Sequence, residues 1–265
     1  MKVLIIGDVV GKPGRSVLTD YLERKKNEYD LVIVNGENAA AGFGLTEKIV
    51  KQFYQIGVDA ITSGNHIWDK KEMVEYLKID HKVLRPLNYP KGVPGVGWNI
   101  FETSNGEKVG VVSLQGRIFM PPIDCPFQRI TEVLDEIRKK TTNIIVDFHA
   151  EATSEKMAMG RFLDGKVSVV LGTHTHIQTS DNKILDGGTG YITDIGMTGS
   201  HDGIIGMTLD SVLPRFLTSL PTKFVICDDN VRVNGIEVEL DPYGKCSDVK
   251  RIDTSIEELD FADFL

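Results

Sequence analysis

Five apolar runs along this chain each end in a short cluster of polar residues that can bind metal ions. In α/β sheets, ligands bind outside the carboxyl ends of the strands, so clusters at these ends can converge on one site. Four of the six histidines lie in the last three clusters. A converging set of Asp, Glu, Asn and His side chains suits two divalent metal ions. The clusters are Gly7-Asp8, Asn35-Gly36-Glu37-Asn38, Gly64-Asn65-His66, Asp147-Phe148-His149 and Gly172-Thr173-His174-Thr175-His176.

The first third of the chain alternates between strand and helix patterns. Helical spacing of Val17, Leu18, Tyr21 and Leu22 indicates the first helix. Strand–helix alternation predicts a parallel sheet with crossover helices. The expected strands are Lys2–Gly7, Leu31–Val34 and Asp59–Thr62, and the expected helices are Gly14–Tyr29, 46–56 and Lys70–Lys78.

The remainder mixes hairpins with helices. It predicts two sheets packed together with helices outside, in a single domain over residues 1–265. The expected strands are Val83–Leu87, Trp98–Thr103, Lys108–Leu114, Asn143–Phe148, Val167–Gly172, Ile184–Asp186, Gly190–Asp194, Lys223–Asp228 and Asn230–Leu240. The expected helices are Phe127–Lys140, Ser154–Phe162, Met207–Leu220 and Ile256–Leu265.

The composition limits the class of partner. The net charge of −8 and the lack of a basic block argue against duplex nucleic acid, because binding its phosphates needs clustered Lys and Arg. Cys125, Cys227 and Cys246 are scattered, which predicts reduced thiols and no disulfide framework. The first apolar run is too short for a signal peptide, and none approaches membrane-spanning length, so we expect a cytoplasmic protein.

Several polar residues also have simpler interpretations. Asp8 could cap the following helix, and Asn35-Gly36 is typical of a turn. A phosphate-binding loop is excluded at Gly11-Lys12, because the glycines are spaced wrongly and no Ser or Thr follows the lysine. We expect Trp68 to be half-buried in the core. We expect Asp194 to form a turn that could also line the site.

The histidine clusters indicate metal chemistry more specifically. Asn65 can bind a metal ion through its carbonyl oxygen, and the neighbouring His66 could act as an acid. In an extended segment, residues two apart point the same way, so His174 and His176 could face one site. His149 alone would be equally consistent with a buried polar residue.

Together, the clusters resemble the sequence pattern of the calcineurin-like metallophosphoesterases. Those enzymes present an Asp, a second acidic residue, Gly-Asn-His, a lone His and a Gly-His-x-His segment in this order. This chain has Val10 where a His is usual, Gly36-Glu37-Asn38 in place of Gly-Asp-x-x-Asp, and Thr173 inserted before His174. The resemblance implies an α/β fold, a four-layer αββα sandwich of two mixed sheets flanked by helices.

The departures are similar to those of one branch, the YmdB-like bacterial phosphodiesterases. This resemblance covers nearly the whole chain. It implies hydrolysis of 2′,3′-cyclic nucleotides to 3′-nucleotides at a site with two metal ions, with iron as the first choice and Mn or Zn as alternatives. The matched blocks are residues 7–15, Asn35-Gly36-Glu37-Asn38, Gly42-Phe43-Gly44, residues 64–68 and residues 194–199.

Carried over by motif, the resemblance also assigns the site residues. Glu37 would bridge the two metal ions, and His66 would be the proton donor. The remaining ligands would be Asp8, Asn38 and His176 on one ion and Asn65, His149 and His174 on the other.

The expected mechanism follows from two metal ions. Ions about 3.5–4 Å apart can hold a hydroxide between them and lower the pKa of its parent water toward about 7. The hydroxide would attack phosphorus, and His66 would protonate the departing 2′ oxygen. Asp8, Glu37 and the hydroxide would each carry one negative charge, and two divalent cations would carry four positive charges. The site would then have one net positive charge, which complements the single negative charge of a phosphodiester.

Other functions are consistent with the same residues. The site could cleave 3′,5′-cyclic nucleotides, RNA ends or phosphomonoesters, which product analysis would distinguish. The chain could also be a regulatory metal- or nucleotide-binding protein with weak hydrolysis, although such a protein has no need of a donor at His66. We expect a small nucleotide as partner, no membrane, and the homo-oligomer that is common among soluble proteins.

Overall fold

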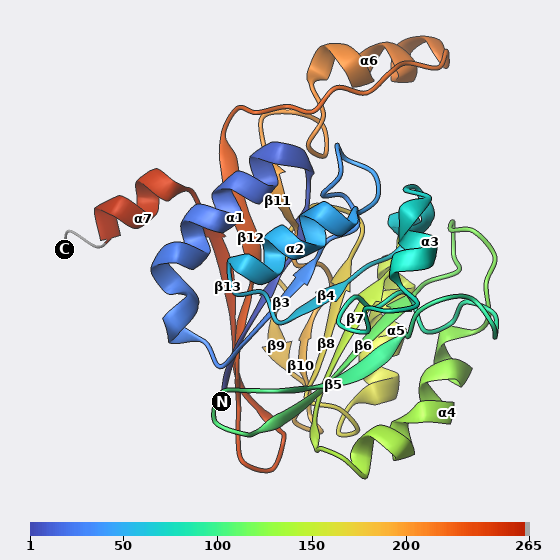
Figure 1. Ribbon diagram of the computed structural model, residues 1–265, viewed down its shortest axis with the longest axis vertical. Helices are drawn as coiled ribbons and strands as arrows, with labels where there is room; N and C mark the ends of the chain where they lie inside the picture. Colours follow the sequence, from blue (N-terminus) through green and yellow to red (C-terminus); the bar gives the residue numbers. More distant parts are fainter. Residues whose placement is uncertain (263–265) are drawn as a thin grey trace.

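A computed structural model describes the backbone of residues 1–262 and the side chains of residues 1–260. It shows two mixed sheets packed face to face with helices on both outer faces (Figure 1). The predicted four-layer α/β sandwich is therefore confirmed. No helix in this part of the chain is long and apolar enough to cross a membrane.

The first sheet has seven strands and carries the N-terminus. Its order is β2-β11-β12-β1-β3-β4, with β13 paired to β12. Strands β1, β3 and β4 are parallel, as the alternating pattern predicts, and β12 runs antiparallel to β1. The bounds are β1 Lys2–Ile6, β2 Asp8–Val9, β3 Leu31–Asn35, β4 Ala60–Thr62, β11 Met197–Ser200, β12 Val231–Leu240 and β13 Cys246–Thr254.

The second sheet has six strands in the order β5-β6-β7-β8-β10-β9. Its four central strands are parallel, and the antiparallel pairs β5–β6 and β9–β10 are the two predicted hairpins. The bounds are β5 Trp98–Glu102, β6 Lys108–Gln115, β7 Asn143–His149, β8 Val169–Thr173, β9 Lys183–Ile184 and β10 Gly190–Ile192.

Alternation along the strands separates three apolar layers. Val3 and Ile5 of β1 lie in the core between the two sheets, with Val109 and Val111 of β6 opposite. The alternate residues of β1 pack outward against α1 (Gly11–Lys25) and α2 (Glu47–Gln55). The outer face of the second sheet packs against α4 (Pro126–Arg138) and α5 (Thr153–Leu163). This alternation fixes each strand's register, because a slip by one residue would turn every side chain to the other face.

The remaining helices are short and flank the strand ends. The 3-10 helix η1 spans Lys26–Glu28 after α1, and η2 spans Asn65–Trp68 directly after β4. Helix α3 (Glu72–Tyr76) follows, and α6 (Leu209–Thr218) stands off the body of the molecule (Figure 1). Helix α7 (Ile256–Ala262) lies beside α1 and forms most of the helix predicted at 256–265, whose last three residues lie outside the described part.

Two strand predictions were wrong, and the short strands β2 and β11 and the long strand β13 were not predicted. Val83–Leu87 forms only isolated bridges at Val83 and Leu84, because Pro86 has no N–H to extend a ladder. Residues 223–228 form a single bridge at Ile226, and Val225 beside it is half exposed without a partner strand. Strand β13 was missed because its buried residues Cys246, Val249 and Ile252 are three positions apart, not two, and the residues between them are polar or charged.

Two smaller predictions are confirmed. Trp68 is partly buried against the core and meets the Tyr89 ring edge-on, at 5.6 Å between centroids. Cys125, Cys227 and Cys246 are all free thiols.

Candidate metal centre

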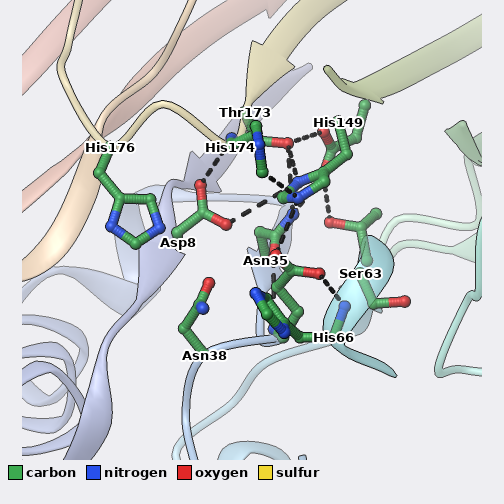
Figure 2. Close-up of polar contacts among 12 residues, drawn as sticks. Asp8, Asn35, Asn38, Ser63, His66, His149, Thr173, His174 and His176 are labelled. Carbon is green, nitrogen blue, oxygen red and sulfur yellow. Dashed lines mark hydrogen bonds and ion pairs between the residues drawn. The ribbon is translucent and has the colours of Figure 1, made fainter. Parts of the chain in front are cut away.

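Residues of the five predicted clusters lie close together (Figure 2). The first sheet contributes Asp8 from β2, Glu37 and Asn38 from the turn after β3, and Asn65 and His66 from η2. The second sheet contributes His149 at the end of β7 and His174 and His176 just after β8. The structure therefore brings residues of both sheets to a single site, as the strand-end pattern predicts.

Glu37, His149 and His174 form the tightest group of possible ligands. Each offers one atom such that the three atoms lie within 4.8 Å of one another. The Glu37 Oε1 and His174 Nδ1 atoms lie 2.8 and 3.0 Å from His149 Nε2. Glu37 and His149 are almost fully buried. A carboxylate and two imidazoles at this spacing are suited to a first-row metal ion.

Three further oxygens point to cations in the same place. Asp8 Oδ1, Asn38 Oδ1 and Asn65 Oδ1 are buried and have no hydrogen-bond partner. Buried polar atoms are rarely left unpaired in native proteins, and a bound ion can satisfy those that are. The Asn38 amide donates to the Gly42 carbonyl at 2.9 Å, which fixes its nitrogen and leaves its oxygen free. The chemistry of these side chains is therefore suited to binding metal ions at this place.

The predicted backbone of the His-x-His segment was wrong. His174 and His176 have φ angles of 98° and 65°, which lie in the left-handed region and are not extended. Such strain in non-glycine residues clusters at functional sites, where the surroundings enforce it. The His174 N–H donates to Asp8 Oδ2 at 3.1 Å, and His176 Nδ1 lies 3.2 Å from the Ile205 carbonyl oxygen. Both imidazoles still line the same cavity.

A buried pair holds this strained segment in place. Asp194, expected to form a turn, pairs with Lys156 of α5 at 2.6 Å, and both side chains are at most 2% exposed. The same carboxylate accepts from the N–H and the hydroxyl of Thr175, at 3.2 and 2.7 Å. Asp194 thereby fixes the residue between His174 and His176. Nothing in the sequence indicated Lys156, because a helical lysine is usually solvated.

His149 is oriented by a buried hydrogen-bond chain. Its Nδ1 lies 2.9 Å from Thr173 Oγ1, and this hydroxyl donates to Asp147 Oδ1 at 2.8 Å. Asp147 also accepts from Thr62 at 2.6 Å and Asn35 at 3.1 Å. Such partners fix the ring orientation of a ligand histidine and leave its other nitrogen for the metal. Thr173, the residue inserted relative to the family pattern, therefore has a structural role.

His66 lies beside the proposed metal ligands but is more exposed than Glu37 and His149. Its Nδ1 is 2.9 Å from Asp69 Oδ2, and its backbone N–H donates to Glu37 Oε2 at 3.0 Å. Its side chain is 28% exposed and lines the same cavity as His174 and His176. Because Asp69 holds Nδ1, Nε2 is left for a reacting group.

The buried acids and histidines of the site shift one another's pKa values. Burial raises the pKa of Asp8 to about 8, although His149 opposes this. Burial would also raise the pKa of Glu37, but the charge of His149 and its hydrogen bond lower it to about 2. Burial disfavours charge on His149, but Glu37 and Asp8 raise its pKa to about 9. Burial and the neighbouring His149 lower the pKa of His174 to about 3. A bound cation would favour the carboxylates and neutral imidazoles instead.

Gly64 makes this packing possible. A Cβ at this position would overlap the imidazole ring of His149. The glycine before Asn65 and His66 therefore lets the two sheets approach at the site.

Two mixed sheets flanked by helices, with carboxylate, amide and imidazole ligands at their strand ends, are typical of metallophosphoesterases. The sequence pattern of the YmdB-like protein family matches residues 4–252. The chain belongs to this family.

Individual relatives agree with this placement. The chain is 48% identical over 247 residues to the 2′,3′-cyclic-nucleotide 2′-phosphodiesterase of Bacillus subtilis (strain 168), an alignment covering 92% of this chain and 93% of the relative. A hypothetical protein from Thermus thermophilus superposes with a TM-score of 0.92 at 43% identity, over 96% of this chain and 99% of that chain. A novel phosphatase from Mycoplasma pneumoniae gives a TM-score of 0.88 at 31% identity, over 100% and 99%.

Proposed function

We propose that this protein is a metal-dependent phosphodiesterase that hydrolyses 2′,3′-cyclic nucleotides to 3′-nucleotides. The observation that carries this proposal is the cluster of Glu37, His149 and His174 together with three buried oxygens that lack hydrogen-bond partners. This cluster lies beside a cavity that His66 lines. The identity to the Bacillus subtilis enzyme supports the choice of substrate.

We assign two metal ions to the site, with iron as the first choice and Mn or Zn as alternatives. Glu37 would contact both ions, since its two oxygens face His149 and the His66 backbone. Bound metal ions would neutralise phosphate charge and lower the pKa of water to supply a nucleophile at neutral pH. One ion would take Asp8, Asn38 and His176, and the other would take Asn65, His149 and His174.

His66 is the proposed proton donor. Asp69 accepts from Nδ1, which orients the ring and leaves Nε2–H to protonate the departing 2′ oxygen. A regulatory binding site would need none of this arrangement.

The charge of the site favours a phosphodiester. Asp8 and Glu37 are the two carboxylates among the proposed ligands, and two divalent cations would outweigh them. A phosphodiester carries a single negative charge and complements this excess.

The test is product analysis after metal-loaded protein is incubated with 2′,3′-cyclic AMP. We expect 3′-AMP as the product, and we expect His66→Ala to form it far more slowly at unchanged metal content. His81→Ala is the matched control, because His81 is exposed and lies outside the site. No conversion by the wild-type protein at full metal content would refute the proposal, and 2′-AMP would refute the assigned bond.

A further inference from the structure

A cavity of about 430 Å³ opens directly over the proposed metal ligands. Glu37, His66 and the two histidines after β8 line its floor. Its walls come from the 204–207 loop, from α6 and from Phe224, and they are largely apolar. A phosphodiester held at the floor would therefore carry its remaining substituent into an apolar space.

Two phenylalanines give this space an aromatic wall. The rings of Phe43 and Phe224 are roughly parallel, at 24° and 6.3 Å between centroids. Phe43 also meets the His66 ring edge-on, at 5.0 Å between centroids. The aromatic wall therefore begins beside the proposed proton donor and runs away from the floor. Both phenylalanines line the cavity and are only partly buried.

Arg215 of α6 adds a cation to the same wall. Its guanidinium lies 5.5 Å from the centroid of the Phe224 ring, and its side chain lines the cavity. A guanidinium over an aromatic ring offers both a flat stacking surface and hydrogen-bond donors. Nucleobases present a flat face and acceptor atoms at their edges, which match this combination.

Helix α6 leaves apolar surface next to the cavity uncovered. Phe216 lines the cavity but is 76% exposed, and Val212 is the only apolar residue of α6 that is buried. Figure 1 shows α6 standing clear of the body of the molecule. A bound aromatic group would cover part of this apolar surface.

We propose that Phe43, Phe224 and Arg215 form a nucleobase-binding site, which rests on the proposed function and names how the substrate is recognised. The base stacks on the phenyl wall while the cyclic phosphate reaches the floor. Since every base has an aromatic face, stacking of this kind tolerates all four bases. The site therefore selects nucleotides over small phosphodiesters and discriminates weakly among bases.

The test compares 2′,3′-cyclic AMP with a base-free probe, methyl riboside 2′,3′-cyclic phosphate. We expect the wild-type protein to prefer the nucleotide in kcat/KM by about tenfold or more, the scale of stacking one base on an aromatic side chain. Phe224→Ala should bring the ratio toward one, mainly by raising KM for the nucleotide. Phe224→Trp should retain the preference, and Tyr243→Ala, at an exposed ring on the β12–β13 turn, should leave it unchanged.

The outcomes separate the two proposals. Equal kcat/KM for both probes in the wild-type protein would overturn the nucleobase site while leaving the activity intact. Failure to convert either probe would refute the activity. In that case calorimetric titration with 3′-AMP and with methyl riboside 3′-phosphate decides the nucleobase site, and equal affinities would overturn it. An unchanged preference in Phe224→Ala would overturn the assigned wall.

Discussion

Replacing Lys156 by Met should strongly destabilise the protein. Lys156 Nζ lies 2.6 Å from Asp194 Oδ2, and the two side chains are 2% and 1% exposed. Removing one partner of such a buried pair leaves a charge that water cannot reach, which usually costs about 3–5 kcal/mol. Asp194 would keep hydrogen bonds from Thr175 and from the Gly196 N–H. We therefore expect the free energy of unfolding to fall by about 3 kcal/mol, the lower end of this range.

The assay is urea unfolding of the metal-free protein, followed by tryptophan fluorescence and analysed by linear extrapolation. Lys51→Met is the matched control, because Lys51 pairs with Glu47 on the exposed face of α2 and should cost less than about 0.5 kcal/mol. Adding Asp194→Asn to Lys156→Met removes the unpaired charge and should recover part of the loss. A Lys156→Met variant within about 1 kcal/mol of wild type would refute the reasoning.

Three further predictions concern the site itself. Gly64→Ala should sharply reduce bound metal, measured by elemental analysis, because the added methyl group overlaps the His149 ring; full metal content would contradict the packing argument. Thr173→Val should weaken metal binding about 10- to 100-fold in a competition titration, because His149 loses its hydrogen-bond partner. The control Thr131→Val, on the exposed face of α4, should leave metal binding unchanged. His66→Ala should slow hydrolysis of cyclic nucleotides by about 10²–10⁴-fold but slow a nitrophenyl ester much less, because its leaving group needs no proton. Equal losses on both substrates would exclude His66 as the donor.

The sequence was sufficient to predict the layers and the place of the site. Apolar runs such as Val3–Ile6 predict strands by composition alone, and a polar residue at the end of each run marks the edge where ligands meet. These local signals mark the clusters, but His149 alone was equally consistent with a buried polar residue. The order of the clusters along the chain and the family resemblance assigned its role and those of Asp8, Glu37 and Asn65.

What the sequence did not predict depends on contacts between distant residues. Asp147 accepts hydrogen bonds from Thr62 and Thr173, and Lys156 pairs with Asp194. These contacts join strands and helices that are distant in the sequence, so no local pattern predicts them. The left-handed backbone of His174 is uncommon for a residue other than glycine, and its N–H donates to Asp8, which is distant in the sequence. Strand β13 was missed because its pairing with β12, rather than a regular apolar alternation, defines it.

The site draws its side chains from both sheets, and this has a consequence for the molecule as a whole. Asp8 lies in the first sheet, and Glu37 and Asn65 directly follow two of its strands. His149 lies in the second sheet, and His174 directly follows one of its strands. Cations bound among them would act as a cross-link at the open edge of the sandwich. A ligand that binds only the folded chain adds about 2.7 kcal/mol of stability at 100 times its dissociation constant. The melting temperature of the protein should therefore rise with the supply of metal, and chelation would loosen the contact between the sheets as well as stop the chemistry.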